Sequence, residues 1–361
     1  MRPKKQSIYM MIVCLFLLIL IFDSESAMLG AREGMDLCIS TVIPSLFPFI
    51  VISILLNGFL SNQSFRILHP LGKLMHLPSC SEGLLLIGLF GGYPVGAHNV
   101  VEAYKNGRLT REQAERMLPF CNNAGPAFIF GIGASIFSEF WLCALVWIIQ
   151  IVSAVLTGCL SCSTNDASKF HQEFTSVSLT DAVHRSIRVI ASISGWIVLF
   201  RVIIVYLQRW VFCSFSNNVQ ILICGLLELS NGSLSLNAVF PIAHRFTPFC
   251  LMLCFGGLCI TMQTKSLLVG TDLSFRTYLP GKMAQTSICY LLCAMITPLI
   301  SSEETKFPNP MLLITSILCC LYYRNITKNS KMNIAFPFQF MYNKLQRNQG
   351  GHTYEPISQE G

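Results

Sequence analysis

One apolar stretch of this chain is interrupted by residues that a membrane helix rarely holds. Between Phe120 and Gly133 the sequence reads FCNNAGPAFIFGIG, with two adjacent carboxamides, a proline and three glycines. Hydrocarbon offers no partner to backbone N–H and C=O groups, so a helix unwinds at membrane depth only inside protein or beside a water-filled cavity. Secondary transporters bind their substrates at such interruptions. The interruption therefore predicts a transporter of a small solute.

Other apolar runs carry similar interruptions. Gly91–Gly96 reads GGYPVG, and Glu228–Gly232 reads ELSNG. The pair Gly256-Gly257 marks a further place where a spanning helix can break. Close packing of helices through small residues explains that pair equally well.

The composition limits the chain to a membrane protein. Apolar residues make up 53% of its 361 residues and charged residues only 12%, whereas a soluble domain has about 25% charged residues. The net charge of +7 does not indicate nucleic-acid binding, because the basic residues lie in short loops and the C-terminal tail rather than in one stripe with aromatics. We therefore expect an all-α polytopic protein in contact with the lipid bilayer.

The 16 cysteines do not predict a disulfide framework, because most lie inside apolar runs and serve there as small hydrophobes. Cys159-x-x-Cys162 also fits a redox or metal site, but it closes a hydrophobic span without a second pair. Signatures of metalloproteases, P-loops, dinucleotide sites and serine hydrolases are absent. We expect no enzyme activity, no metal and no cofactor, apart from a coupling proton or sodium ion.

Basic loops predict the topology through the positive-inside rule. Apolar runs of spanning or near-spanning length cover residues 8–22, 38–60, 83–104, 117–137, 140–162, 187–208, 219–240, 246–263, 284–301 and 308–323. The first follows Arg2, Lys4 and Lys5, and we expect an uncleaved span there rather than a signal peptide. The basic tail is expected on the same side, so both termini are predicted to be cytoplasmic.

Two runs are expected to be re-entrant hairpins rather than spans. The run 83–104 lies between two basic loops, so both of its ends are predicted to be cytoplasmic. Two legs of about 10 residues each cover about 15 Å, half of a roughly 30 Å hydrocarbon core. The run 219–240 is expected to dip from the outside, and if it spans instead, the sidedness of the C-terminal part inverts. A later loop with Lys265, Arg276 and Lys282 is predicted to be cytoplasmic.

These assignments predict an inverted-topology repeat. A first helix and connector (1–37) precede one unit (38–162), a cytoplasmic linker (163–186) and a second unit (187–301). A last helix (302–325) and a polar basic tail (326–361) complete the chain.

The candidate solute contacts lie at the interruptions. Asn122 and Asn123 offer carboxamide donors and acceptors. These groups either contact a solute or ion, or only cap the backbone freed at Gly125. Glu228 lies deep in an apolar run, where a carboxylate is functional by default. Glu228 either binds a coupling ion or the substrate, or forms a buried ion pair with Arg201 or Arg188 that fixes helix packing.

Other candidates have a structural alternative as well. Gly92, Tyr93 and Pro94 form the tip of the first predicted hairpin, as a solute contact or only as a rigid turn. The lone His98 that follows is more simply a satisfied polar residue. Asn231 is included with Glu228 as a candidate substrate contact.

Ordered motifs along the chain resemble a known family. They are PSLFPF from Pro44, GGYPVGA from Gly91, FCNNAGP from Phe120, GLLEL from Gly225 and FGGLC from Phe255. Over roughly residues 8–325 the chain resembles the YlbJ-like sporulation integral membrane proteins, in the nucleoside-recognition Gate group related to concentrative nucleoside transporters.

The resemblance implies a role in late (stage V) spore formation and passage of dipicolinate across the outer forespore membrane. It carries over Gly92, Tyr93, Pro94, Asn122, Asn123, Gly125 and Glu228 as site candidates. A dianionic substrate favours helix N-termini and a nearby arginine, and Arg201 is the candidate for that charge. A nucleoside carrier on the same scaffold and a non-transporting assembly factor stay open. Other sporulation membrane proteins, or a second copy of the chain, are possible partners.

Overall fold

The computed structural model describes residues 3–60, 68–77, 81–161, 177–240, 242–300 and 310–328, and regular structure within these ranges is entirely helical. The chain divides into two compact units. The first, Met1–Glu25 with Lys331–Gly361, contains helix α1 (Pro3–Phe22). The second, Ser26–Ser330, contains the remaining helices and the candidate site. The expected polar tail (326–361) lies almost wholly outside the described residues.

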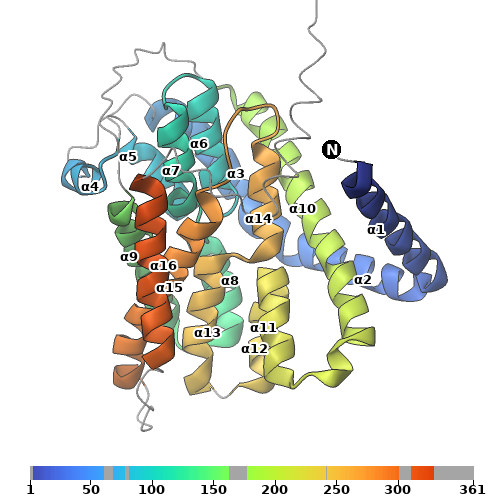
Figure 1. Ribbon diagram of the computed structural model, residues 1–361. Coiled ribbons are helices and arrows are strands. Elements are labelled where there is room, and N and C mark those ends of the chain that lie inside the picture. Colours follow the sequence, from blue (N-terminus) through green and yellow to red (C-terminus); the bar gives the residue numbers. More distant parts are fainter. Residues whose placement is uncertain are drawn as a thin grey trace, which may run out of the picture. The chain divides into compact units, whose positions relative to one another are not determined.

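Figure 1 shows the helices of the larger unit, which follow one another in chain order. They are α2 (Ser24–Leu37), a π-helical turn (Cys38–Val42), α3 (Ile43–Leu60), α4 (His69–Leu74), α5 (Glu82–Gly91), α6 (Val95–Lys105), α7 (Arg111–Cys121), α8 (Pro126–Ile136), α9 (Phe140–Leu160), α10 (Leu179–Trp210), the 3-10 turn Phe212–Ser214, α11 (Asn217–Leu227), α12 (Leu229–Val239), α13 (Ile242–Phe255), α14 (Gly257–Leu267), α15 (Tyr278–Ile300) and α16 (Pro310–Lys328).

Several of these helices are long and apolar enough to cross a membrane. By length and composition, four candidate spans are found among the described residues: Ser24–Leu56, Phe140–Leu160, Leu179–Trp210 and His244–Leu267. The last consists of α13 and α14, separated by Gly256 alone. The expected polytopic all-α architecture is therefore confirmed at this level.

Every interruption proposed from the sequence is an interruption of helix in the structure. Helices α5 and α6, of 10 and 11 residues, are separated by residues 92–94, and α7 and α8, of 11 residues each, by residues 122–125. Glu228 alone separates α11 from α12, which also have 11 residues each. A capping box starts α7, since Thr110 Oγ1 accepts from Gln113 N–H and Gln113 Oε1 accepts from Thr110 N–H.

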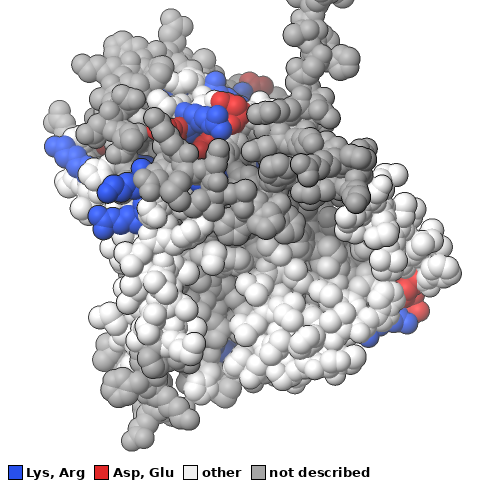
Figure 2. All heavy atoms as spheres, in the orientation of Figure 1, with Lys and Arg blue, Asp and Glu red and all other residues white. Residues whose placement is uncertain are grey.

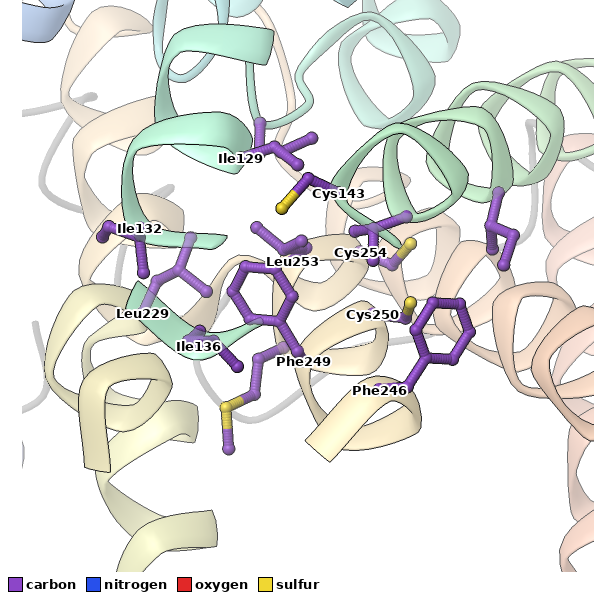
Figure 3. Close-up of a cluster of buried hydrophobic side chains, with 14 of the residues drawn as sticks. Ile129, Ile132, Ile136, Cys143, Leu229, Phe246, Phe249, Cys250, Leu253 and Cys254 are labelled. Atoms are coloured by element: carbon purple, nitrogen blue, oxygen red, sulfur yellow. The ribbon is translucent and has the colours of Figure 1, made fainter. Parts of the chain in front are cut away.

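The short helices pack as pairs around longer ones. Helices α5 and α6 pack against each other and against α7, while α11 packs against α12. The larger unit is described below as two halves, the helices before residues 162–176 (α2–α9) and those after them (α10–α16). Helix α15 packs against α7, α9, α13 and α16, so it touches both halves. Figure 3 shows the core between the halves, where Phe249 and Leu253 of α13 point toward Ile132 and Ile136 of α8 and Leu229 of α12.

The outer surface of the larger unit suits a bilayer. Large apolar side chains on α9, α10 and α16 are exposed, including Phe140, Ile148, Ile187 and Ile314. Figure 2 shows a broad uncharged area over α11, α12 and α13, with the described charged side chains gathered mostly toward the upper end of the view. Apolar side chains that face outward over such an area match lipid contact.

Two sequence-based boundaries need correction. Lys282, predicted to lie in a basic loop, lies in α15 and is fully buried, because that helix begins at Tyr278 instead of near residue 284. The expected linker 163–186 is helical from Leu179, where α10 begins after Ser178, whose hydroxyl accepts from Asp181 N–H as an N-cap. Residues 162–176 lie outside the described residues.

Candidate functional site

The helix interruptions of the two halves meet inside the larger unit. A Cβ placed on Gly125 would lie 3.0 Å from Gly92 Cα, and one placed on Gly256 would lie 3.2 Å from the hydroxyl of Tyr93. A Cβ placed on Gly257 would lie 3.1 Å from the carbonyl oxygen of Gly225, near the carboxyl end of α11. Approaches this close show that the breaks form one contiguous region.

Gly92 and Gly256 have a second reason to be glycine. Their φ angles are +80° and +82°, in the region that side chains disfavour. Gly256 ends α13 in the left-handed conformation, and its N–H donates to the carbonyl of Met252. Helices commonly end this way, which allows α14 to start at once.

Asn122 joins three elements through its buried carboxamide. Its Nδ2 donates to Thr264 Oγ1 at 2.9 Å and to the Tyr278 hydroxyl at 3.0 Å. Its Oδ1 accepts from the backbone N–H of Ala97 at 3.4 Å, in the first turn of α6. Asn122 is 0% exposed, so its polar atoms are committed to protein partners in this conformation.

Asn123 is the start of a hydrogen-bond chain that reaches α15. Its Nδ2 donates to the Phe120 carbonyl at 2.7 Å, which caps the end of α7. Its Oδ1 accepts from Gln285 Nε2 at 2.7 Å. Gln285 Oε1 in turn accepts from Lys282 Nζ at 2.7 Å. Asn123 thus caps the backbone at Phe120 rather than at Gly125, and the same side chain also belongs to a longer network.

The tip of the first hairpin contributes an aromatic ring. The Tyr93 hydroxyl donates to the Leu253 carbonyl at 2.6 Å, near the end of α13. The ammonium of Lys282 lies 5.3 Å from the centre of the same ring, a distance suited to a cation–π contact. Pro94 directly precedes α6. Tyr93 therefore links the first hairpin to the second half rather than forming a turn alone.

Glu228 caps the helix that follows it. Its carboxylate accepts from the backbone N–H groups of Ser230 at 3.0 Å and Asn231 at 2.8 Å, and from Asn231 Nδ2 at 2.6 Å. The residue is 3% exposed. An acidic side chain at a helix N-terminus is stabilised by the helix dipole and the free N–H groups.

Arg201 lies elsewhere, on α10. Its guanidinium pairs with Glu33 of α2, at 2.7 Å from Nη2 and 2.9 Å from Nε to the same carboxylate oxygen. The structure gives Glu228 no ion pair with Arg201 or Arg188 among the described residues. Arg201 as the partner of a substrate charge stays a prediction, and its charge already has a partner.

Contacts between loops tie the two halves together at one end of the unit. The Tyr104 hydroxyl, near the end of α6, bonds to the Asp272 carboxylate. The backbone N–H of Ser274 donates to Glu115 Oε1 at 2.7 Å. The segment between α14 and α15 is thereby held against α6 and α7.

Sequence reasoning missed several polar residues of this region. Lys282, Gln285, Tyr278 and Thr264 complete the network around Asn122 and Asn123. Gln150 on α9 is 2% exposed, and neither polar atom of its carboxamide has a hydrogen-bond partner among the described residues. The sequence placed Lys282 in a basic loop before the apolar run 284–301, so its local context gave no sign of burial.

The structure adds no metal site to this picture. Among the described ranges, no group of three or more His, Cys, Asp or Glu side chains is arranged to hold a metal ion. The polar atoms present are carboxamides, hydroxyls, one carboxylate and one ammonium. Such a set recognises a polar organic solute through hydrogen bonds and charge.

Fold and surface together define an integral membrane protein with several spans. The chain is 22% identical over 301 residues to the sporulation integral membrane protein YlbJ of Bacillus subtilis (strain 168), a match that covers 71% of this chain and 74% of that protein. The chain is therefore a distant homologue of YlbJ, which confirms the resemblance seen in the motifs. No protein-family model matches the chain, and no solved structure matches it.

Proposed function

We propose that this protein is a membrane transporter of a small anionic metabolite, and that the metabolite is dipicolinate moved across the outer forespore membrane late in sporulation. The homologue YlbJ is named as a sporulation integral membrane protein, which supports the membrane location and the link to sporulation. The substrate follows from the family resemblance. No enzymatic step is part of the proposal.

The convergence of helix N-termini is the observation that carries the proposal. Helices α6, α8, α12 and α14 all begin at the interruptions that meet in the middle of the unit. Glu228 occupies the N-terminus of α12, and Asn122 reaches the first turn of α6. The N-cap residues of α8 and α14 are glycines without a side-chain cap. Uncapped N-termini favour an anion through their free N–H groups and the helix dipole.

The proposal includes a membrane arrangement. We assign α5–α6 and α11–α12 as re-entrant hairpins from opposite sides, and α7–α8 and α13–α14 as broken spans. The order of span, hairpin, broken span and span then occurs once in α3–α9 and again, inverted, in α10–α15. Helix lengths support this, since each hairpin leg has 10 or 11 residues and covers about half of the hydrocarbon core.

Uptake into proteoliposomes tests the function. Purified protein is reconstituted, and labelled dipicolinate uptake is measured with uridine as competitor and Asn123→Ala as the site variant. We expect saturable uptake that uridine does not reduce and that Asn123→Ala abolishes. Asn123 serves as the probe because its carboxamide joins the break to α15.

Other results assign the protein differently. Uptake of uridine in place of dipicolinate makes it a nucleoside carrier on the same scaffold. Correctly inserted protein that takes up neither compound contradicts transport and favours an assembly factor. Normal spore dipicolinate in a strain carrying Asn123→Ala, with normal protein level, contradicts the site.

A further inference from the structure

Lys282 is the most unusual charge in the described part of the chain. It is 0% exposed, and it lies on α15 beside the break between α7 and α8. Its ammonium donates to Gln285 Oε1 at 2.7 Å, to the Asn122 carbonyl at 2.9 Å and to the Pro119 carbonyl at 3.5 Å. All three acceptors are neutral, so the hydrogen bonds are satisfied while the charge is not balanced.

The surroundings of the ammonium hold no counter-charge. Among the described residues, no carboxylate lies within 4.0 Å of Lys282 Nζ. The titratable groups near it are the Tyr93 ring, the Tyr278 phenol that reaches Asn122, and the Cys254 thiol of α13. A buried ion without a partner of opposite charge is strongly disfavoured. An anion that enters this region would remove that penalty.

A second buried polar group, the side-chain amide of Gln150 on α9, lacks a hydrogen-bond partner among the described residues. Tyr93, under Lys282, bonds the carbonyl of Leu253, and the next residue, Cys254, lies 3.5 Å from Ser153 Oγ on α9. The Ser153 hydroxyl donates to the backbone carbonyl of Gln150 at 2.9 Å. The side-chain amide of Gln150 is buried, and neither of its polar atoms has a hydrogen-bond partner in the described part of the chain. Buried polar groups in native proteins nearly always have partners, so a solute or water is expected here.

We propose that Lys282 supplies the positive charge that pairs with a carboxylate of the solute, in place of Arg201, with Gln285 as its neutral partner when no solute is bound. The inference rests on the proposed transport function and names the group that selects anions. Gln285 Oε1 is suited to this exchange, because it accepts from the same ammonium and its Nε2 stays on Asn123. The solute class is a small aromatic or aliphatic carboxylate.

The experiment compares a charged ligand with an uncharged one of the same shape. Binding and uptake of pyridine-2,6-dicarboxylate and of its diamide are measured for wild type, Lys282→Met and Lys282→Gln. Glutamine retains donors for the Asn122 carbonyl, so it protects against simple loss of folding. We expect both variants to lose affinity for the dicarboxylate at least about tenfold more than for the diamide. Lys265→Met, which removes a lysine from the last turn of α14, is expected to leave the ratio unchanged.

The outcomes separate this inference from the proposed function. Equal losses for both ligands show that Lys282 only supports the fold, which overturns the inference while transport stands. Lys282-dependent binding of the dicarboxylate without uptake supports the inference and overturns transport. Wild-type protein that neither binds nor takes up the dicarboxylate overturns both.

Discussion

Both halves contain interrupted helices, but they satisfy the freed backbone differently. In the first half, the gap between α7 and α8 is filled by Asn122 and Asn123. They bond to Ala97 and Phe120 and also to Thr264, Tyr278 and Gln285, which lie 142 to 162 residues away on α14 and α15. In the second half, Glu228 bonds only to residues two and three positions ahead, and Gly256 turns the chain without any side chain. The side chains at the break between α7 and α8 thus reach distant helices, whereas the carboxylate of Glu228 makes local contacts.

Glycine packing sharpens this contrast. A Cβ on Gly88 or on Gly96 would lie 2.0 Å or 1.7 Å from the backbone oxygen of Cys121, in another helix. In the second half, a Cβ on Gly232 would lie 2.2 Å from Gly225 Cα, in the other leg of the same hairpin. Helices α5 and α6 thus fit closely to each other and to the backbone of α7. Helices α11 and α12 fit closely to each other and to the side chain of Met252 on α13.

The largest loss of stability is expected from the substitution Gly96→Ala. The added methyl group collides with backbone that cannot turn aside, so we expect a loss of about 3 kcal/mol or more in the free energy of unfolding. Thermal unfolding in detergent measures this. Gly131→Ala is the matched control, since nothing lies within 4 Å of its Cβ position. A stable Gly96→Ala variant would contradict the close fit of α6 on α7.

The next largest effect is expected from Asn123→Ala, which removes the cap of α7 and the bond to Gln285. We expect a cost of about 2 kcal/mol, from the lost hydrogen bonds and the unpaired Gln285 amide. A double-mutant cycle with Gln285→Ala should give a coupling energy of about 1 kcal/mol or more. Additive effects of the two substitutions would show that the long-range link does not hold the first half.

A smaller effect is expected from Glu228→Gln, because the contacts of Glu228 are local. The amide keeps one acceptor for the N–H groups of α12, so we expect a cost of about 1 kcal/mol. Glu228→Ala removes both acceptors and should cost more, as unfolding in detergent will show. If Glu228→Gln abolishes uptake at unchanged stability, the carboxylate acts on the solute or coupling ion and the local account is incomplete.

The smallest change in stability is expected from Gln150→Leu. A buried carboxamide without partners contributes nothing, so leucine should leave the unfolding free energy unchanged or raise it by about 1 kcal/mol. Under the proposed transport function, uptake in proteoliposomes should nevertheless fall, because the variant lacks a buried amide that has no hydrogen-bond partner among the described residues. A marked loss of stability would instead reveal that Gln150 has partners in the folded protein.

The sequence predicted the helix breaks better than their partners. Proline, paired glycines and paired asparagines end helices through local backbone effects, which are readable from neighbouring residues. The capping box of Thr110 and Gln113 at the start of α7 has a local sequence pattern of the same kind. The repeat and the hairpins as membrane elements stay predictions.

The side chains that bond to the residues at the helix breaks could not be predicted from the sequence. Lys282 precedes an apolar run and was taken for a loop residue, since nothing local shows that three acceptors surround its ammonium. Gln150 looks like one polar residue in an apolar helix, and only packing shows that it lacks a partner. Long-range side-chain contacts depend on helix packing, which periodicity and charge do not specify.

The Cys121 carbonyl sets a limit on how this protein can move. Gly88 of α5 and Gly96 of α6 both approach this oxygen, so the pair α5–α6 packs closely around the end of α7. Sliding either leg by one residue brings a side chain against that oxygen. We therefore expect α5, α6 and the end of α7 to move together in any change of conformation.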